Sequence, residues 1–303
     1  MRRAIAAAKN GVAFPYDKDG SAFTLACPKG VYSGARTVNS KFIFAFESHL
    51  KRLVQPTSGI VKDASDEELV DLVKPRVLST LRAAMDDLKL NHSFPPTQEF
   101  KITLIVQPSA DATSMTQVVK EPGKGDVLCH IGLMGSKDGK DIKVQVAGTP
   151  RHNPLVKDLQ WAKDRQSLYD AMSPDTEELI LMDPSTRLLY EASQSNFFAV
   201  HGNQVVTANE GILKGTMRDL VLESCEALEI PVVHSPPLVD DAPLWSGAFL
   251  SSTSRFVLPI HHFEYQTKDG VNTTVDYSPC PTIEKLRQHV LATVQSHSTM
   301  VFD

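Results

Sequence analysis

The sequence contains few cysteines and no paired cysteine motif. Among its 303 residues there are four, Cys27, Cys129, Cys225 and Cys280, and no two of them have the Cys-x-x-Cys spacing of a zinc ribbon. Disulfide-stabilised secreted domains need a dense set of cysteines in a short chain. A zinc ribbon and a disulfide-stabilised secreted domain are therefore disfavoured. We expect the protein to reside in a reducing compartment.

Long apolar runs and a surplus of basic charge are also missing. No apolar stretch reaches the length of a membrane-spanning helix. The segment MRRAIAAAKNGVAF starts with basic residues, but its apolar part is too short for a secretory signal, while an organellar transit peptide stays open. With a formal net charge of −5, the chain offers no broad basic surface to nucleic acid or anionic lipid. We expect a cytoplasmic protein without a nucleic-acid or membrane partner.

Internal repeats and low-complexity tracts are absent, so the sequence is that of a globular protein. Its hydrophobic content of 42% is enough to bury a large core, most naturally in two domains. In the first half, residues 41–46 resemble a strand and residues 47–55 have helical spacing. Ser65 and Glu68 form a capping box at the start of another helix, and Pro75 either kinks this helix or begins the next one.

Both halves of the sequence mix helices with strands. Further strands are expected in the first half at 99–107, 126–134 and 142–148. In the second half, helices are expected at 157–172, 216–228 and 281–296, and strands at 177–183, 188–200, 204–209, 230–235 and 247–260. The stretch GTPRHNP, rich in Gly, Pro and polar residues, separates the halves. The predicted fold is therefore α+β with a small N-terminal domain at 1–148, a linker at 149–153 and a larger C-terminal domain at 154–303.

Three short stretches of the second half gather small and hydroxyl residues at the ends of predicted elements. They are EASQSN at 191–196, LKGTMRD at 213–219 and LSSTSR at 250–255. The main-chain N–H groups of Thr216 and Met217, at the start of a helix, could hold an anion with help from the helix dipole. Taken one at a time, these stretches also fit ordinary helix capping and polar turns.

Together and in this order, the three stretches resemble the signature of the class IV pyridoxal-phosphate aminotransferases. This family includes branched-chain and D-amino acid aminotransferases and aminodeoxychorismate lyase. Its motifs are Glu-x-x-x-Ser-Asn, here at 191–196, Leu-x-Gly-x-x-Arg, here at 213–218, and Ser-x-Thr ahead of an apolar-Pro strand, here at 251–259. The first half agrees, because GVYSGARTVNSKFIFAFESHLKRL is similar to the family's N-terminal segment, with its pocket aromatic residue and its His-Leu-x-Arg-Leu helix.

The resemblance implies a fold, a cofactor and an assembly. The fold is PLP fold type IV, with a mixed, barrel-like sheet in the C-terminal domain, the cofactor is pyridoxal 5'-phosphate, and the chain forms a homodimer without a metal. Lys157 is implied as the lysine that holds the cofactor as a Schiff base, or aldimine, with Lys163 as its local competitor. Glu191 is implied as the carboxylate that keeps the pyridine nitrogen protonated. Once released from the cofactor, Lys157 would carry the proton between the substrate Cα and the cofactor.

Other residues of the implied site bind the cofactor or face the substrate. The phosphate is expected at Arg52, the Thr216 and Met217 N–H groups and the Thr253 hydroxyl. The other implied cofactor-binding positions are Ser195, Asn196, Gly215 and Ser252, and the implied substrate-pocket positions are Tyr32 and Ser254. For Ser193, Ser195 and Asn196, a turn that bonds its own backbone explains the residues about equally well.

The sequence departs from the family at positions that bear on the substrate. Ala162 stands where many members have a tyrosine that reaches the cofactor's phenolic oxygen, and Met217 stands where a hydroxyl residue is common. The stretch EFKITLIVQPSAD has no arginine of the kind that traps the substrate carboxylate in D-amino acid enzymes. The expected activity is amino-group transfer between an amino acid or amine and a keto acid. A lyase of the aminodeoxychorismate type and a catalytically impaired PLP-binding protein are the alternatives.

Overall fold

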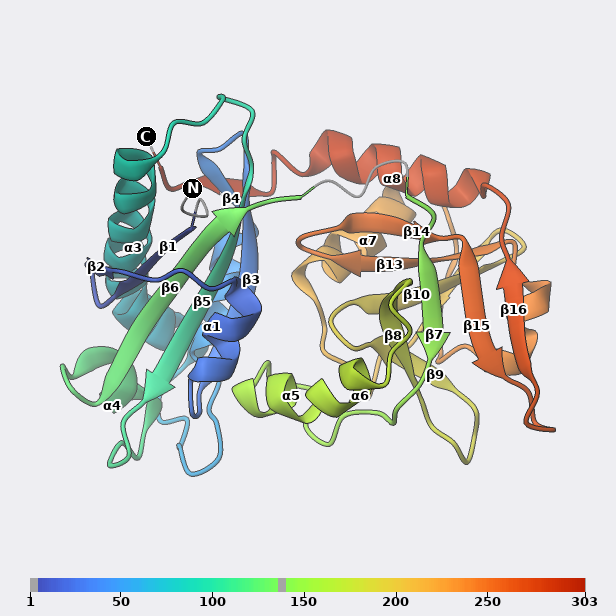
Figure 1. Ribbon diagram of the computed structural model, residues 1–303, viewed down its shortest axis with the longest axis horizontal. Coiled ribbons are helices and arrows are strands. Elements are labelled where there is room, and N and C mark those ends of the chain that lie inside the picture. Colours follow the sequence, from blue (N-terminus) through green and yellow to red (C-terminus); the bar gives the residue numbers. More distant parts are fainter. Residues whose placement is uncertain (1–4, 136–139, 303) are drawn as a thin grey trace. The chain divides into compact units, whose positions relative to one another are not determined.

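The structure, a computed structural model, describes residues 5–135 and 140–302 and divides into two compact units of similar length (Figure 1). Unit 1 comprises Met1–Gly135, Val156–Asp164 and Gln295–Asp303, and unit 2 comprises Ser136–Leu155 and Arg165–Val294. The segment 156–164, which contains Lys157, thus belongs to unit 1 although it follows the stretch predicted as a linker.

Unit 1 is built on an antiparallel sheet with the strand order β17-β4-β3-β5-β6-β1-β2. Its elements are β1 Ile5–Lys9, β2 Val12–Phe14, α1 Gly20–Ala26, β3 Val31–Val38, β4 Phe42–Phe44, α2 Phe46–Leu53, α3 Asp66–Asn91, β5 Phe100–Pro108, α4 Met115–Lys120, β6 Gly125–Leu133, α5 Leu159–Asp164 and β17 Ser298–Met300. Residues 1–4 of the segment considered as a transit peptide lie outside the described residues, and the part from Ile5 onward forms β1 and β2.

The two faces of this sheet are covered by different helices, and the alternation of side chains along β5 shows why. Ile102, Leu104 and Val106 point into the main core, which the buried residues of α3 complete. Ile105 points to the opposite face, where it packs with Phe23 of α1. A strand that is apolar on both faces needs cover on both, and α3 and α1 provide it.

Unit 2 is built on a mixed sheet, with the strand order β12-β11-β10-β9-β8-β7-β15-β16 and the hairpin β13-β14 attached to β10. The pairs β11-β12, β7-β8 and β7-β15 are parallel. Its elements are β7 Lys143–Val146, α6 Gln166–Asp170, β8 Thr176–Met182, β9 Leu189–Ala192, β10 Asn196–His201, β11 Gln204–Thr207, α7 Thr216–Ala227, β12 Val232–His234, the 3-10 helix η1 Val239–Leu244, β13 Gly247–Ser252, β14 Phe256–Ile260, β15 His262–Gln266, β16 Asn272–Asp276 and α8 Pro281–Thr293. With helices and strands in both units and a mixed sheet in the second, the predicted α+β class is confirmed.

Two segments predicted as single strands are hairpins, and this correction matters for the site. Residues 188–200 form β9 and β10, separated by a turn at 193–195. The turn forms because the buried carboxylate of Glu178 accepts the main-chain N–H groups of Gln194 and Ser195. As a result Glu191 and Asn196 lie opposite each other on neighbouring strands. Residues 247–260 likewise form β13 and β14, with Phe256 at a φ of 57° after the turn.

Two helix predictions are corrected as well. The helix predicted at 157–172 is broken into α5 and α6, and Lys157 precedes both because residues 157–159 lie along the start of β3. Pro75 neither begins a helix nor ends one, since α3 runs continuously from Asp66 to Asn91. Pro75 and Asp71 are exposed, so the carbonyl that loses its N–H donor remains open to solvent. The predicted capping box of Ser65 and Glu68 is confirmed.

The helices of the described residues are too short or too polar to cross a bilayer. This holds for residues 5–135 and 140–302, the part of the chain that the structure covers.

Candidate functional site

The first group of predicted site residues lies in unit 1, around Lys157 and Tyr32. Tyr32 is the second residue of β3 and is 6% exposed. Its main-chain N–H donates to the Lys157 carbonyl at 2.9 Å, and the Lys157 Nζ lies 5.0 Å from the centroid of the Tyr32 ring. An ammonium at this distance from an aromatic face is attracted by the ring quadrupole. The strand and the aromatic side chain therefore hold both the backbone and the amine of Lys157.

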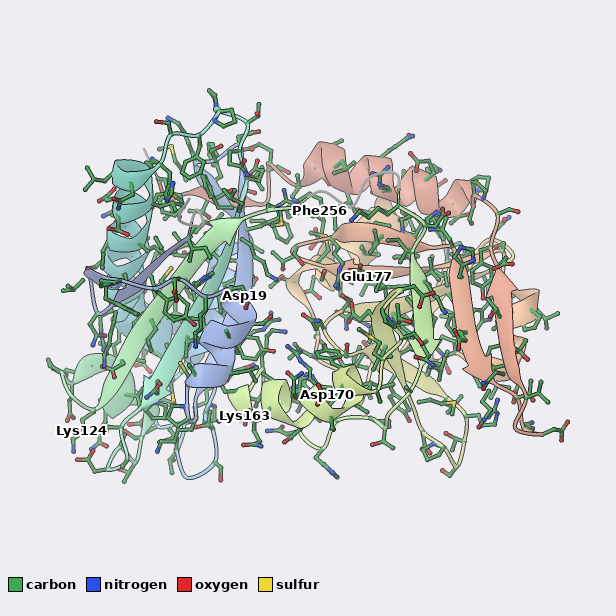
Figure 2. All side chains as sticks on the ribbon, in the orientation of Figure 1. Asp19, Lys124, Lys163, Asp170, Glu177 and Phe256 are labelled. Atoms are coloured by element: carbon green, nitrogen blue, oxygen red, sulfur yellow. The ribbon has the colours of Figure 1, made fainter. Side chains whose placement is uncertain are left out.

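Lys163, the local competitor for the role of Lys157, is engaged elsewhere in unit 1. It lies in the last turn of α5, and Figure 2 labels it. Its Nζ donates to the backbone carbonyl of Pro28 at 2.6 Å. Ala162, at the position where a tyrosine is common in the resembling family, is buried on the same helix. The Lys163 amine is therefore bound to the backbone of unit 1.

Arg52 lies in the last turn of α2, on the same helix as a fully buried histidine, His49. The Nδ1 of His49 is 2.7 Å from the hydroxyl oxygen of Ser33, which is also fully buried. Burial, followed by the positive charges of Arg52 and Lys157, lowers the pKa of His49 from 6.5 to about 3, and the Phe44 backbone acts weakly in the opposite direction. His49 is therefore uncharged at neutral pH and adds no third cation to this group.

The second group lies in unit 2 and is centred on Glu191 of β9. Its side chain is 5% exposed, and its Oε2 accepts the main-chain N–H of Leu213 at 3.1 Å. The Nη1 of Arg151, an equally buried side chain, lies 3.8 Å from the Glu191 Oε1. A buried carboxylate is costly unless it is paired and hydrogen-bonded, and here both conditions are met.

Asn196 holds the segment that leads into α7. Its amide donates to the Leu213 carbonyl at 2.7 Å and its Oδ1 accepts the Gly215 N–H at 3.2 Å. A Cβ on Gly215 would lie 2.3 Å from that Oδ1, so any other residue would displace the Asn196 amide or the turn. Since Glu191 also bonds Leu213, the two facing residues of β9 and β10 fix the same turn.

The N-terminus of α7 has no side-chain cap. Gly215 is the N-cap residue and can offer none, so main-chain N–H groups of the first turn, which start at Thr216 and Met217, keep their capacity to bind an anion. The Thr216 hydroxyl lies 2.9 Å from that of Thr253, in the turn between β13 and β14. Next to Thr253, the hydroxyls of Ser252 and Ser254 are 3.5 Å apart.

Ser193 and Ser195 have their hydrogen-bond partners within the protein. The Ser195 hydroxyl donates to Glu178 at 2.9 Å and accepts from Arg255 at 2.8 Å. Arg255 also forms an ion pair with Glu178 and a second one with Glu177, at 3.0 Å. The hydroxyl of Ser193 accepts from Tyr169 at 3.0 Å. This network joins β8 to the turns that carry Ser195 and Thr253.

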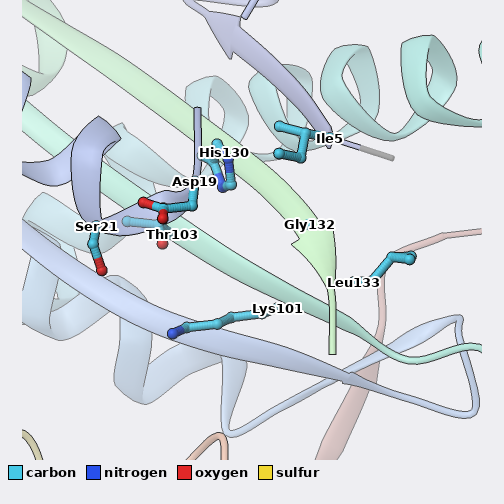
Figure 3. A pocket seen from close by; sticks show the side chains of 9 residues that line it. Ile5, Asp19, Ser21, Lys101, Thr103, His130, Gly132 and Leu133 are labelled. Atoms are coloured by element: carbon cyan, nitrogen blue, oxygen red, sulfur yellow. The ribbon is translucent and has the colours of Figure 1, made fainter. Parts of the chain in front are cut away.

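A cavity in unit 1 does not involve any of these residues. Its volume is about 570 Å³, and its polar lining comes from Asp19, Ser21, Lys101, Thr103 and His130 (Figure 3). The His130 Nε2 donates to the Lys18 carbonyl at 3.1 Å, and burial lowers the pKa of His130. The described residues include no cluster of three or more His, Cys, Asp or Glu side chains placed to hold a metal ion.

The structure thus brings the predicted residues together in two groups, one in each unit. Four residues of this arrangement are not among the predicted site residues: Arg151, which lies in the predicted linker, Ser33, His49 and Glu178. For His49 a signal was present, because Phe46, His49, Leu50 and Leu53 share one helical face by their spacing, which places the histidine among core residues. For Arg151 and Glu178 the sequence contains no comparable pattern.

The chain is similar to known proteins in sequence and in fold. The family model described as amino-transferase class IV matches residues 30–263. A protein of Methanocaldococcus jannaschii, provisionally named a branched-chain-amino-acid aminotransferase, is 23% identical over 245 residues, which is 78% of each chain. The crystal structure of a branched-chain aminotransferase from Thermoproteus uzoniensis with norvaline has a TM-score of 0.70 at 19% identity and covers 98% of this chain and 99% of its own.

A second solved structure shows the same architecture. The branched-chain amino acid aminotransferase from Thermobaculum terrenum, in its PLP form, has a TM-score of 0.69 at 17% identity over 100% of both chains. These similarities confirm the predicted two-domain fold. Because the family model covers most of the chain, from ahead of Tyr32 to beyond Thr253, the protein belongs to the class IV aminotransferases.

Proposed function

We propose that this protein is a pyridoxal-phosphate-dependent aminotransferase that moves an amino group between an amino acid or amine and a keto acid. The observation that carries the proposal is the arrangement in unit 2, where a buried carboxylate and an uncapped helix N-terminus flank one short segment, 213–215. A ligand with a protonated ring nitrogen and a phosphate has matching groups for both.

The donor set fits this cofactor in its chemistry. Glu191 is an acceptor for a ring N–H, and the N–H groups of Thr216 and Met217 with the hydroxyl of Thr253 are donors for a phosphate. Arg52 of unit 1 would add a charged fork to the phosphate. The cofactor, when bound, supplies an electron sink for the negative charge left on the substrate Cα.

The residues of the chain have separate roles in the proposed reaction. Lys157 would hold the cofactor through its Nζ, and the same amine would take the proton from the substrate Cα. Glu191 would accept the hydrogen of the cofactor's ring nitrogen, and Arg151, at 3.8 Å from its Oε1, holds this carboxylate in place. Asn196 keeps the turn before α7 in position, and Tyr32 orients the Lys157 amine and borders the substrate.

The substrate is proposed to be a small amino acid with its keto acid partner. The T. uzoniensis relative was crystallised with norvaline, which is an aliphatic amino acid, and this supports an aliphatic class here. Ala162 provides no phenol at the position where many members of the family have a tyrosine.

A half-reaction screen tests the proposed function. The purified holoenzyme is mixed with single D- and L-amino acids or amines, and the absorption of the bound cofactor and the keto acid formed are followed together. We expect one aliphatic class to convert the cofactor to its amine form with one equivalent of keto acid. Elimination from aminodeoxychorismate without amino transfer would assign a lyase instead, and no reaction with any donor would contradict the proposal.

Assembly and compartment belong to the same proposal. The chain is proposed to act as a homodimer, as its resemblance to the class IV family implies, and a subunit interface would add rigidity. The four cysteines are free and buried, which agrees with a reducing compartment such as the cytoplasm.

A further inference from the structure

The buried pair formed by Ser33 and His49 connects the two unit 1 elements that carry proposed cofactor ligands. Ser33 follows Tyr32 on β3, and the Tyr32 N–H bonds the Lys157 carbonyl at 2.9 Å. His49 lies on α2, three residues and about one turn before Arg52. The bond of 2.7 Å between the Ser33 hydroxyl and the His49 Nδ1 therefore joins the strand that positions Lys157 to the helix that carries Arg52.

The packing of this region does not require a polar pair. Ser33 and His49 are both 0% exposed, and a leucine would fill the place of His49 on the apolar face formed by Phe46, Leu50 and Leu53. Burying two polar side chains costs free energy that their mutual hydrogen bond offsets only in part. The pair fixes the orientation of α2 relative to β3, because a hydrogen bond depends on its angle whereas an apolar contact does not.

We propose that Ser33 and His49 are positioning residues, whose hydrogen bond sets α2 against β3 so that Arg52 meets the phosphate of a cofactor held on Lys157. This inference rests on the proposed function and adds a requirement to it. The pair touches neither the reacting atoms nor the phosphate in this account. Its effect is transmitted through Arg52. Loss of the pair should therefore weaken the binding of ligands that carry the phosphate and leave the binding of ligands that lack it unchanged.

The test compares the binding of pyridoxal 5'-phosphate and of pyridoxal to the apoprotein, followed by absorbance and by fluorescence. In Ser33→Ala and His49→Gln the bond to Nδ1 is lost, and we expect the dissociation constant for pyridoxal phosphate to rise about tenfold, the loss of one buried hydrogen bond. Pyridoxal should bind within about twofold of the wild type. His49→Asn keeps a polar atom near the position of Nδ1 and should retain most of the affinity for pyridoxal phosphate.

A matched control comes from unit 2, where Ser224 and His289 form a similar pair at 3.0 Å. Ser224→Ala removes a fully buried serine hydroxyl from a histidine Nδ1 and should leave the ratio of the two affinities unchanged. Arg52→Ala serves as the positive control and should lower that ratio, and Arg52→Ala combined with Ser33→Ala should add little further loss.

The outcomes separate this inference from the proposed function. If the wild type fails to prefer pyridoxal phosphate over pyridoxal, the proposed function itself is contradicted. If the wild type and Arg52→Ala behave as expected but Ser33→Ala and His49→Gln keep the wild-type ratio, the inference alone is wrong. Retention by His49→Gln with loss in His49→Asn would assign the effect to Nε2 and overturn the role of Ser33. Unfolding of Ser33→Ala, His49→Gln and His49→Asn, judged by thermal melting, would show that the pair only supports the fold and would overturn the inference.

Discussion

At the scale of single residues, the proposed role of Glu191 depends on partners that the sequence does not predict. The motif predicts a carboxylate, but its partners, Arg151 at 3.8 Å and the Leu213 N–H at 3.1 Å, come from segments 40 and 22 positions away. Such long-range partners have no local pattern in the sequence. The proposed role of Glu191 therefore depends on tertiary contacts of a residue that was read as part of a linker.

Replacing Glu191 by glutamine tests its proposed role. Glutamine preserves the shape and an oxygen that can accept from Leu213, but it removes the charge that keeps the ring nitrogen protonated. We expect bound cofactor to be retained and turnover to fall by about a hundredfold or more. Absorbance of the purified variant and its steady-state rate measure the two effects. Turnover equal to that of the wild type would remove Glu191 from the mechanism.

The same replacement should also affect stability. It leaves the buried Arg151 guanidinium without its anion, and breaking a buried ion pair lowers the free energy of unfolding by up to about 3 kcal/mol. Urea unfolding of Glu191→Gln measures this loss. Adding Arg151→Met removes the stranded charge and should restore part of the stability, whereas a double variant less stable than Glu191→Gln would contradict the pairing.

A second residue-scale prediction concerns pH and His49. Its pKa is lowered to about 3 in the folded protein, whereas an unfolded histidine titrates near 6.5. Between these values the unfolded chain binds one more proton than the folded protein, so stability is present above pH 6.5 and is lost as the pH falls toward 3. From pH 6.5 to 5 this group should cost about 1.5 to 2 kcal/mol.

Urea unfolding at a series of pH values provides the measurement. His49→Asn should show a shallower loss of stability between pH 6.5 and 5 than the wild type does. A loss of equal steepness in both proteins would show that His49 is not buried in its neutral form.

At the scale of elements, the sequence predicts whether a segment is a helix or a strand better than it predicts where the chain turns. The capping box of Ser65 and Glu68 places the start of α3 correctly, because both partners lie within one turn of each other. The reversal at 193–195 was missed because the group that stabilises it, the Glu178 carboxylate, belongs to another strand. The site residues were placed by motif spacing, yet the relation of Glu191 to Asn196 became visible only with the hairpin.

The turn before α7 supplies a prediction at this scale. In Gly215→Ala the new Cβ would lie 2.3 Å from the Asn196 Oδ1, so the side chain or the turn must move. We expect a dissociation constant for pyridoxal phosphate raised at least about tenfold and a stability lowered by about 1 to 3 kcal/mol. Gly135→Ala, at an exposed position where a Cβ meets nothing within 4 Å, is the matched control. Equal affinity and equal stability of the two variants would contradict the proposed role of Asn196 in holding the turn before α7.

At the scale of the whole molecule, the residues proposed to bind the cofactor are distributed over the two compact units. Lys157, Tyr32 and Arg52 belong to unit 1, and Glu191 and Thr253 belong to unit 2. The chain passes between the units more than once, since residues 156–164 and 295–303 return to unit 1. A prediction from sequence alone could place one boundary near the GTPRHNP stretch, but it could not foresee these returns, because they depend on pairing with β3 and β4.

Cofactor retention and dimerisation should be coupled. A ligand that binds only the assembled state stabilises that state, so removal of pyridoxal phosphate should shift the protein toward monomers. Sedimentation at graded protein concentrations, with the cofactor absorbance followed alongside, measures both. We expect a dimer at micromolar concentration in the holoenzyme and weaker association in the apoprotein. A monomer that keeps both its cofactor and full activity would contradict this prediction.

The central claim is that Lys157 is the residue that holds the cofactor. Reduction of the purified holoenzyme with borohydride converts the link between cofactor and lysine into a stable bond, and peptide mapping by mass spectrometry then locates it. We predict a single modified lysine at position 157, next to the Tyr32 ring, and no label in Lys157→Ala. A label on Lys163, whose amine is bonded to the Pro28 carbonyl, or no label at all, would contradict the account.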